Sequence, residues 1–357
     1  MTSFLNPVFE TRIKFLIYRF RFLGLYVVFG LLSLVLEFFI RTNLIRITFD
    51  QIPSTLLAVS CGILFAFWAN VKFNFKIPKS RKNRALVYFV IISCISGMLQ
   101  WSLMQLLVFE NLSYEWGRLL ISGAVFILAY ALHRKYSFRD FKKVGVAIYA
   151  NGIEDLKNIH ERIEYFPDFI HVDIVDKSMC ENAEDIQTYR LEIIKAYWPN
   201  TQVQTHIMSK EPSKWLGQVL PYSDVVYVHA ECDENVTEIL ERIKNSGIKA
   251  GLAITMATNP HEVIELLKKT DYVLLLTIPK PGSSGQKFDL DGLARIKQIN
   301  SLLFRSQFVL CVDGGVNENI INMLEAENIV SGSSVLKNPD PKRQIMRLQT
   351  VSRYEAA

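Results

Sequence analysis

Long runs of apolar residues alternate with short charged segments over the first 140 residues of the chain. Four of these runs, at 22–40, 52–71, 85–109 and 117–133, have lengths within the ~17–25 residues that a membrane-spanning helix requires. We therefore expect an all-α transmembrane domain of four helices at 1–140. The fourth run is the shortest, and a buried amphipathic helix is the alternative interpretation for it.

The pattern changes after about Lys142, where short β-branched runs alternate with amphipathic stretches. The β-branched runs predict eight strands: Val144–Tyr149, Phe169–Ile174, Gln202–Ile207, Asp224–Val228, Lys249–Thr255, Tyr272–Thr277, Gln307–Val312 and Asn328–Ser331. The amphipathic stretches predict helices such as Ala183–Tyr197, Asn235–Asn245, Pro260–Lys269 and Asn317–Glu327. Eight strands with intervening helices predict a (β/α)8 barrel at 144–357, with a doubly wound sheet as the alternative.

Lysine and arginine gather at the ends of the apolar runs. They lie before the first run (Arg12, Lys14, Arg19, Arg21), after the second (Lys72, Lys76, Lys79, Arg81, Lys82, Arg84) and after the fourth (Arg134, Lys135, Arg139, Lys142, Lys143). Because such an excess marks the cytoplasmic side, we expect a multi-pass protein of the inner or plasma membrane. Both termini and the barrel would then be cytoplasmic.

Charge and cysteine placement argue against a nucleic-acid-binding protein and against a disulfide-stabilised one. The net charge of +5 is modest, and its placement beside apolar runs suits a membrane surface, so we expect no nucleic-acid partner. None of the five cysteines forms a close CxxC pair, which favours reduced thiols over a disulfide framework. No small-residue cleavage site follows the first apolar run, so a retained anchor is expected and not a signal peptide.

Imidazole and carboxylate side chains stand where several predicted strands end. They are His171 with Asp173, His206, His229 with Glu231, and Asp313. A parallel barrel brings its strand ends to one face, and these ligand types suit Zn²⁺, Fe²⁺, Mn²⁺ or Co²⁺. A single such residue is usually a capping or packing residue, but the set predicts a divalent-metal site.

Turns rich in glycine and serine follow the last three predicted strands. They are Pro281–Gly285, Asp313–Gly315 and Gly332–Ser334. Each alone is an ordinary turn. Together they predict a phosphate clamp, because barrels bind phosphate with backbone N–H groups from such loops.

The barrel region, roughly residues 144–345, resembles the ribulose-phosphate 3-epimerase family. The motifs that carry the resemblance are His171-Val-Asp173-Ile-Val-Asp176, His206-Ile-Met208, His229-Ala-Glu231, Gly285-Gln-Lys-Phe288, Val312-Asp313-Gly-Gly-Val-Asn317 and Gly332-Ser333.

The resemblance implies epimerisation of a ketose phosphate, such as a pentulose 5-phosphate, through an enediolate. It implies that His171, Asp173, His206 and Asp313 hold the metal, and that Asp173 and Asp313 are the acid–base pair on opposite faces of the substrate. It also implies substrate or phosphate contacts from the remaining positions: Met208, Gly282, Ser284, Gly285, Gly314, Gly315, Gly332 and Ser333.

Several positions depart from that family's pattern without removing a metal ligand. They are Ala147 for Ser, Val175 for Met, Lys177 for Gly, Met256 for Pro, and the Pro279–Gly285 loop for a G-F-G-G core. Since several lie where sugar and phosphate would bind, the substrate can differ from ribulose 5-phosphate. Lys177 or Lys280 would then meet extra negative charge.

A motif recurs at the ends of the second and fourth apolar runs, as Phe67-Trp-Ala-Asn70-Val-Lys72-Phe73-Asn-Phe75 and Tyr130-Ala-Leu-His133-Arg-Lys135-Tyr136-Ser-Phe138. The matched offsets predict a duplicated helix pair, with an ordinary aromatic and cationic interface belt as the alternative. Residues 15–140 resemble the GtrA-like family, with His133 where asparagine is usual. That resemblance implies a polyprenyl-phosphate-bound sugar as partner. Asn70 and His133 would either form hydrogen bonds at the helix ends or contact a lipid phosphate with help from Lys72, Arg134 and Lys135. Phe75 and Phe138 complete the two copies of the motif.

Two functional hypotheses follow, and a homo-oligomer is compatible with both. In the first, the chain is a membrane-tethered, metal-dependent sugar-phosphate epimerase that serves cell-envelope polysaccharide synthesis. In the second, it is a GtrA-like translocation or scaffold protein whose barrel only binds a sugar phosphate.

Overall fold

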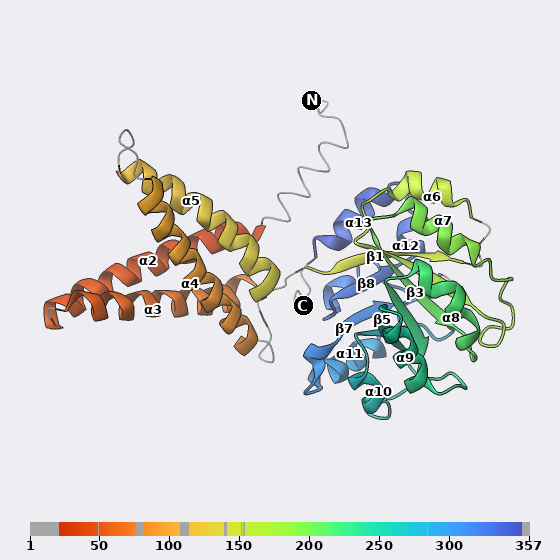
Figure 1. The fold of residues 1–357 in the computed structure, drawn as a ribbon. Helices are drawn as coiled ribbons and strands as arrows, with labels where there is room; N and C mark the ends of the chain where they lie inside the picture. The colour runs from red at the N-terminus through yellow and green to blue at the C-terminus, as the bar shows by residue number, and fades with distance from the viewer. Residues whose placement is uncertain are drawn as a thin grey trace. The chain divides into compact units, whose positions relative to one another are not determined.

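The computed structural model describes residues 21–48, 50–75, 77, 82–107, 114–138, 141–150, 152, 154–283 and 285–351. The chain divides into two compact units, residues 1–140 and 141–357. The first unit is helical, and the second is a barrel of strands surrounded by helices (Figure 1). Of the basic residues beside the apolar runs, Arg12, Lys14, Arg19, Lys76, Lys79, Arg81 and Arg139 lie outside the described residues.

Four long helices make up the described part of the first unit: α2 (Arg21–Thr48), α3 (Gln51–Ala69), α4 (Lys82–Leu107) and α5 (Tyr114–Leu132). The predicted four-helix arrangement is therefore present. Among the described residues, three helical stretches are long and apolar enough to cross a membrane: Phe22–Ile47, Gln51–Asn74 and Lys82–Leu103. The crossing by α5 stays a prediction.

The two copies of the repeated motif have the same unusual backbone. Helix α3 continues into the π-helical turn η1 (Asn70–Asn74), and α5 continues into the π-helical turn η3 (His133–Phe138). In the first turn the Asn74 amide donates to Asn70 Oδ1 at 3.0 Å. In the second, His133 Nδ1 lies 3.1 Å from Ser137 Oγ at the same spacing. The rings of Phe75 and Phe138 stack with their centroids 4.0 Å apart, so the two motifs meet.

The second unit is a closed barrel of eight strands, each paired in parallel with its neighbours in chain order, and β8 pairs with β1. The closed order excludes the doubly wound sheet. The strands are β1 (Lys143–Tyr149), β2 (Phe169–Val175), β3 (Gln202–Met208), β4 (Val225–His229), β5 (Lys249–Ile254), β6 (Tyr272–Leu276), β7 (Val309–Asp313) and β8 (Asn328–Ser331).

Short helices surround the barrel (Figure 1). The α-helices are α6 (Leu156–Ile163), α7 (Tyr189–Tyr197), α8 (Ser213–Val219), α9 (Val236–Asn245), α10 (Ile264–Lys268), α11 (Asp291–Ser301), α12 (Ser333–Leu336) and α13 (Pro341–Gln349).

Two buried clusters hold the barrel together, as strands buried on both faces require. The larger cluster joins strand residues such as Val146 to helix residues such as Leu191. The smaller one includes Phe169 and Tyr227. Gly145 and Gly251 make room for these rings, because a Cβ atom there would lie 2.1 Å from the Phe169 ring and 2.3 Å from the Tyr227 ring.

Three helix predictions in this unit need correction. The helix expected at Pro260–Lys269 begins only at Ile264. The stretch Asn317–Glu327 does not form an α-helix and contains only the 3-10 turn η6 (Ile321–Met323). Asn317 Oδ1 accepts from the Asn319 N–H at 2.9 Å, which favours a local turn over a helix. The predicted helix Ala183–Tyr197 begins only at Tyr189, after a turn in which the Ala183 N–H donates to the Cys180 carbonyl.

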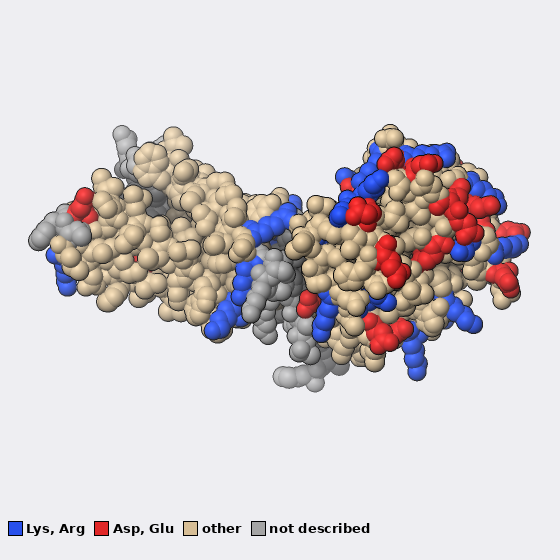
Figure 2. All heavy atoms as spheres, turned by 90° about the horizontal axis from the view of Figure 1, so that it is seen from below, with Lys and Arg blue, Asp and Glu red and all other residues tan. Residues whose placement is uncertain are grey.

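The two units differ in surface chemistry (Figure 2). On the face shown, the helical unit carries few charged residues over most of its length, whereas the barrel carries lysine, arginine and carboxylate side chains intermixed. Large apolar side chains of α2 and α4 are exposed, among them Phe39 and Trp101 at 67% and 69%. This exposure is typical of helices that face lipid.

Candidate active site

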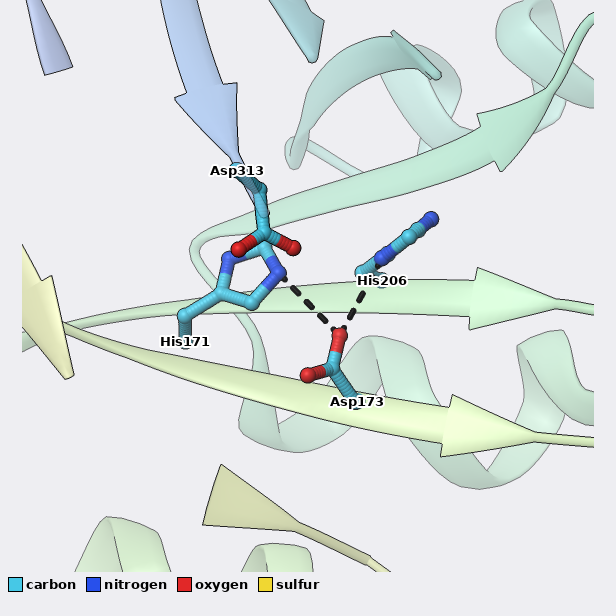
Figure 3. A group of neighbouring side chains, drawn as sticks. All are labelled: His171, Asp173, His206 and Asp313. Atoms are coloured by element: carbon cyan, nitrogen blue, oxygen red, sulfur yellow. Dashed lines mark hydrogen bonds and ion pairs between the residues drawn. The ribbon is translucent and has the colours of Figure 1, made fainter. Parts of the chain in front are cut away.

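Four ligand side chains converge from three strands at one end of the barrel (Figure 3). His171 and Asp173 lie two residues apart on β2, so they share a face of the strand. Asp173 is in register with His206 of β3. Asp313 is the last residue of β7. The alternation of strand side chains thus brings together the four residues that the sequence predicted.

The cluster has the geometry of a metal site. One ligand atom from each of the four residues lies within 4.8 Å of all the others. Asp173 Oδ1 is 3.3 Å from His171 Nε2 and 3.1 Å from His206 Nδ1. Nδ1 of the buried His171 has no hydrogen-bond partner among the described residues, and its Nε2 has only the 3.3 Å contact with Asp173; buried imidazole nitrogens usually have partners. Two imidazoles and two carboxylates therefore fit a divalent transition metal.

The two carboxylates of the cluster have different electrostatic surroundings. Burial favours the neutral form of Asp173, but the adjacent His171 counters burial, and the pKa of Asp173 lies well below the usual value. Burial and the charge of Asp173 raise the pKa of Asp313 to about 7. Burial also lowers the pKa of His206 to about 4. The neutral imidazole is the form that ligates a metal.

A cavity of about 420 Å³ opens beside the cluster. Asp173 and Asp313 line it, whereas His171 and His206 do not. The other predicted substrate contacts that line it are Met208, Gly282, Gly285, Gly314, Gly315, Gly332 and Ser333. Ser284 lies outside the described residues. The predicted phosphate clamp and the predicted acid–base pair therefore share one cavity.

Backbone conformation explains the two glycines after β7. Gly314 and Gly315 have φ of +105° and +68°, which residues with a side chain rarely adopt. A Cβ on Gly315 would lie 2.2 Å from the Phe288 nitrogen. Thr277 holds this turn in place, because its hydroxyl donates to the carbonyls of Asp313 and Gly314 at 2.8 Å each.

The loop after β6, which departs from the family's pattern, is closed by Gln286. Its side-chain amide donates to the Lys280 carbonyl at 2.6 Å and to the Ser283 carbonyl at 2.8 Å. Its carbonyl oxygen accepts from the Lys280 N–H at 3.2 Å. The extra residue of this loop is thus accommodated in a turn that still borders the cavity with Gly282.

Several cavity residues were not foreseen. Tyr149 ends β1 beside the cluster, and burial together with the charges of Asp173 and Asp313 raises the pKa of its hydroxyl. Other lining residues lie in α6, just before it, or just after α12, namely Glu154, Asp155, Asn158, Arg162 and Lys337.

The lysines expected to meet extra negative charge are not among the described residues that line the cavity. Lys177 instead forms an exposed ion pair, in which its Nζ lies 2.6 Å from Asp185 Oδ1.

His229 and Glu231 belong to the predicted set of imidazole and carboxylate groups at strand ends, but they are not among the four clustered ligand residues. His229 is fully buried, and its Nε2 lies 2.9 Å from Nε2 of His206. Its Nδ1 lies 3.0 Å from Glu231 Oε2. The only sequence signal for this arrangement was the position of the pair at the end of a strand.

Comparisons with known proteins divide the chain close to the boundary between the two compact units. The model of the ribulose-phosphate 3-epimerase family matches residues 143–336, and the model of the GtrA/DPMS transmembrane domain matches residues 25–138.

Three curated relatives resemble the barrel part. The ribulose-phosphate 3-epimerase of Bacillus subtilis (strain 168) is 29% identical over 195 residues, covering 51% of this chain and 86% of that protein. That of Helicobacter pylori (strain J99) is 31% identical over 192 residues, covering 52% and 86%. That of Escherichia coli (strain K12) is 28% identical over 189 residues, covering 51% and 83%. The similarity therefore covers most of each relative and about half of this chain.

Proposed function

Because the chain belongs to the ribulose-phosphate 3-epimerase family and carries a GtrA/DPMS transmembrane domain, we propose that it is a membrane-tethered epimerase acting at carbon 3 of a ketose phosphate. A pentulose 5-phosphate is the simplest such substrate. The single observation that carries the proposal is the convergence of His171, Asp173, His206 and Asp313 beside a cavity lined by glycine-rich turns.

His171, Asp173, His206 and Asp313 would hold the divalent ion. When bound, such an ion acts as a Lewis acid that polarises the substrate carbonyl and stabilises negative charge on its oxygen. The buried ring of His171, whose Nδ1 has no hydrogen-bond partner among the described residues, supports this role. The donor set is compatible with zinc, iron, manganese or cobalt.

The two aspartates would carry the proton transfers. Epimerisation inverts one carbon, so one group must take its proton and another must return a proton from the opposite face. Asp173 extends from β2 and Asp313 from β7 (Figure 3), and both line the cavity. One carboxylate would accept the carbon 3 proton to leave an enediolate, and the other, as the carboxylic acid, would protonate the same carbon. Their roles exchange in the reverse reaction.

The remaining cavity residues would bind and shield the substrate. The turns at Gly285, Gly315 and Gly332 would receive the phosphate on backbone N–H groups, since glycine permits close approach. Met208 and Leu276 are 3% and 1% exposed and line the same cavity. They would form an apolar wall that keeps water from the enediolate.

Deuterium exchange tests the proposed reaction directly. The full-length protein, in lipid nanodiscs and with its metal quantified, is incubated with ribulose 5-phosphate and other ketose phosphates in D₂O. We expect metal-dependent deuterium entry at carbon 3, observed by NMR. Asp173→Asn and Asp313→Asn each remove one of the two proton-transfer groups, so each should reduce turnover by at least ~100-fold.

Asp185→Asn is the matched control, because Asp185 pairs with Lys177 on the surface and does not line the cavity. It should leave exchange unchanged. Absence of exchange with every ketose phosphate, despite stoichiometric metal, would contradict the proposal and favour a barrel that only binds a sugar phosphate.

We propose further that the helical unit binds a polyprenyl-phosphate-linked sugar and that the enzyme serves cell-envelope polysaccharide synthesis. The match to the GtrA/DPMS domain and the buried polar turns at Asn70 and His133 support this proposal. Mass spectrometry of lipids that copurify with the protein tests it. Retention of polyprenyl phosphates by the wild type, and their loss in Asn70→Leu/His133→Leu, is expected. Equal retention by both would contradict it.

A further inference from the structure

A line of side chains, buried except for the partly exposed Glu231 at its end, extends away from the metal-ligand cluster across β2, β3 and β4. It starts at Asp173, whose Oδ1 lies 3.1 Å from His206 Nδ1. The other nitrogen of His206 lies 2.9 Å from His229 Nε2, and His229 Nδ1 lies 3.0 Å from Glu231 Oε2. Both histidines are fully buried. We call the three residues His206, His229 and Glu231 the relay.

The far end of the relay is firmly anchored. Glu231 Oε1 accepts from the Thr255 N–H and the Thr255 hydroxyl at 2.9 Å each, and also from the Thr258 hydroxyl. All three partners are hydrogen-bond donors, and all three contact the same oxygen. The other oxygen, Oε2, is thereby directed at His229. An ionised carboxylate only accepts hydrogen bonds.

This anchor fixes where the hydrogens of the relay lie. Because Glu231 accepts, His229 must carry its hydrogen on Nδ1, which leaves a lone pair on Nε2. His206 must then carry its hydrogen on Nε2 to donate to that lone pair. Its Nδ1 is left as a lone pair that faces Asp173 Oδ1. Two acceptors 3.1 Å apart without a hydrogen between them repel each other, unless a cation lies beside both.

We propose that His229 and Glu231 are positioning residues that hold His206 in the Nε2–H tautomer, so that its Nδ1 is available to the divalent ion. The inference rests on the proposed metal site but concerns residues that do not contact the ion or the substrate. A hydrogen-bonded partner on the second nitrogen of a ligating histidine fixes its tautomer and raises its basicity.

The variant Glu231→Gln should reverse which atoms donate and which accept hydrogen bonds along the relay, because glutamine has nearly the same size and shape as glutamate. The three donors at Thr255 and Thr258 require an oxygen at the Oε1 position, so the glutamine NH₂ group should take the Oε2 position. That group donates to His229 Nδ1, which moves the hydrogen of His229 to Nε2. His206 must then accept on Nε2 and carry its hydrogen on Nδ1, where it blocks the ligand lone pair.

Two readouts follow, neither of which is activity. In the metal-free full-length protein in nanodiscs, ¹⁵N labelling of its six histidines allows the tautomers to be read from ring-nitrogen chemical shifts. We expect His206 as Nε2–H in the wild type and as Nδ1–H in Glu231→Gln. We also expect affinity for Zn²⁺, measured by competition with a chromophoric chelator, to fall by about 10- to 100-fold.

Glu234→Gln is the matched control. Glu234 is a carboxylate on the same loop, and it accepts from the Ser213 N–H at 2.8 Å without contacting the relay. It should change neither the tautomers nor the affinity for Zn²⁺.

Unchanged tautomers and unchanged Zn²⁺ affinity in a folded Glu231→Gln variant would overturn the inference. If that variant does not fold, the wild-type spectrum decides, because His206 with its hydrogen on Nδ1 in the wild type would also overturn it. The outcomes separate this inference from the proposed epimerase. A wild type that binds Zn²⁺ and has His206 as the Nε2–H tautomer, but exchanges no carbon 3 proton, refutes only the epimerase.

Discussion

At the residue scale, Glu231 makes barrel stability depend on pH. Burial alone would raise its pKa, but hydrogen bonds from His229, from the Thr258 hydroxyl and from the Thr255 N–H outweigh burial and lower it to about 2. A carboxylate with a lowered pKa stabilises the folded state above its unfolded pKa of about 4.5, and this stabilisation is lost as the pH falls through about 2.

We therefore predict a pH-dependent stability difference between the wild type and Glu231→Gln. The wild-type barrel should be the more stable above about pH 5, by at most about 3 kcal/mol. The difference should shrink progressively between about pH 4.5 and pH 2. Hydrogen exchange of β4 and β5 peptides, compared between the two proteins at each pH, measures it. A difference that is the same at pH 3 and pH 7 would contradict the prediction.

Asp173 and Glu231 show which contacts of single residues can be predicted from the sequence and which cannot. Asp173, His171 and His206 were predicted together because strand periodicity and strand ends determine which residues share a face. The relay was not, because the direction of a hydrogen bond depends on the donors at Thr255 and Thr258, which are distant from His206 in the sequence. Spacing along the chain contains no record of such contacts.

At the element scale, two glycines determine how the barrel interior packs. Gly145 and Gly251 each stand where an added Cβ would overlap an aromatic ring of the neighbouring strand. Gly217 in α8, by contrast, has no atom within 4 Å of an added Cβ. These positions allow matched substitutions of the same size.

Gly145→Ala and Gly251→Ala should each destabilise the barrel by ~1–3 kcal/mol, because an overpacked interior forces strand or ring displacement. Gly217→Ala should be neutral or stabilising by up to ~1 kcal/mol, since alanine is the better helix former. Thermal unfolding of the full-length protein in micelles, followed by near-ultraviolet circular dichroism, compares the three. Equal melting temperatures for all variants would contradict the prediction, because the strands would then accommodate the added methyl group without loss of stability.

Strands were predicted better than helices, and the reason is physical. Strand β8 is buried throughout and β3 is buried after its first residue, and their observed ends differ from the predicted ones by one residue at most. Asn317–Glu327 has the spacing of an amphipathic helix, yet its Asn317 side chain stabilises a turn and Leu324 is already extended as the chain approaches β8. Local side-chain bonds of this kind override periodicity in short segments.

At the scale of the whole molecule, the charge pattern predicts an orientation. Lys72, Lys82 and Arg84 lie at the ends of two candidate spans, on the side that should face the cytoplasm. A membrane-impermeant lysine reagent should modify exposed barrel lysines, such as Lys177 and Lys249, in inside-out vesicles but not in right-side-out vesicles. Detergent should remove the difference. Modification in right-side-out vesicles only would place the barrel on the opposite side.

Closure of the barrel between β1 and β8 has a consequence for biosynthesis. Val144 of β1 pairs with Ile329 of β8, although the two residues lie near opposite ends of the barrel sequence. At a translation rate of ~5–20 residues per second, Ile329 is synthesised on the order of ten seconds or more after Val144. During that interval the nascent sheet has two open edges, while the helices that precede it have already been made and can insert into the bilayer. Such edges invite intermolecular pairing. A chain that ends before Asn328 would therefore have the first seven strands but no closed barrel, and both edges of its sheet would stay open to pairing.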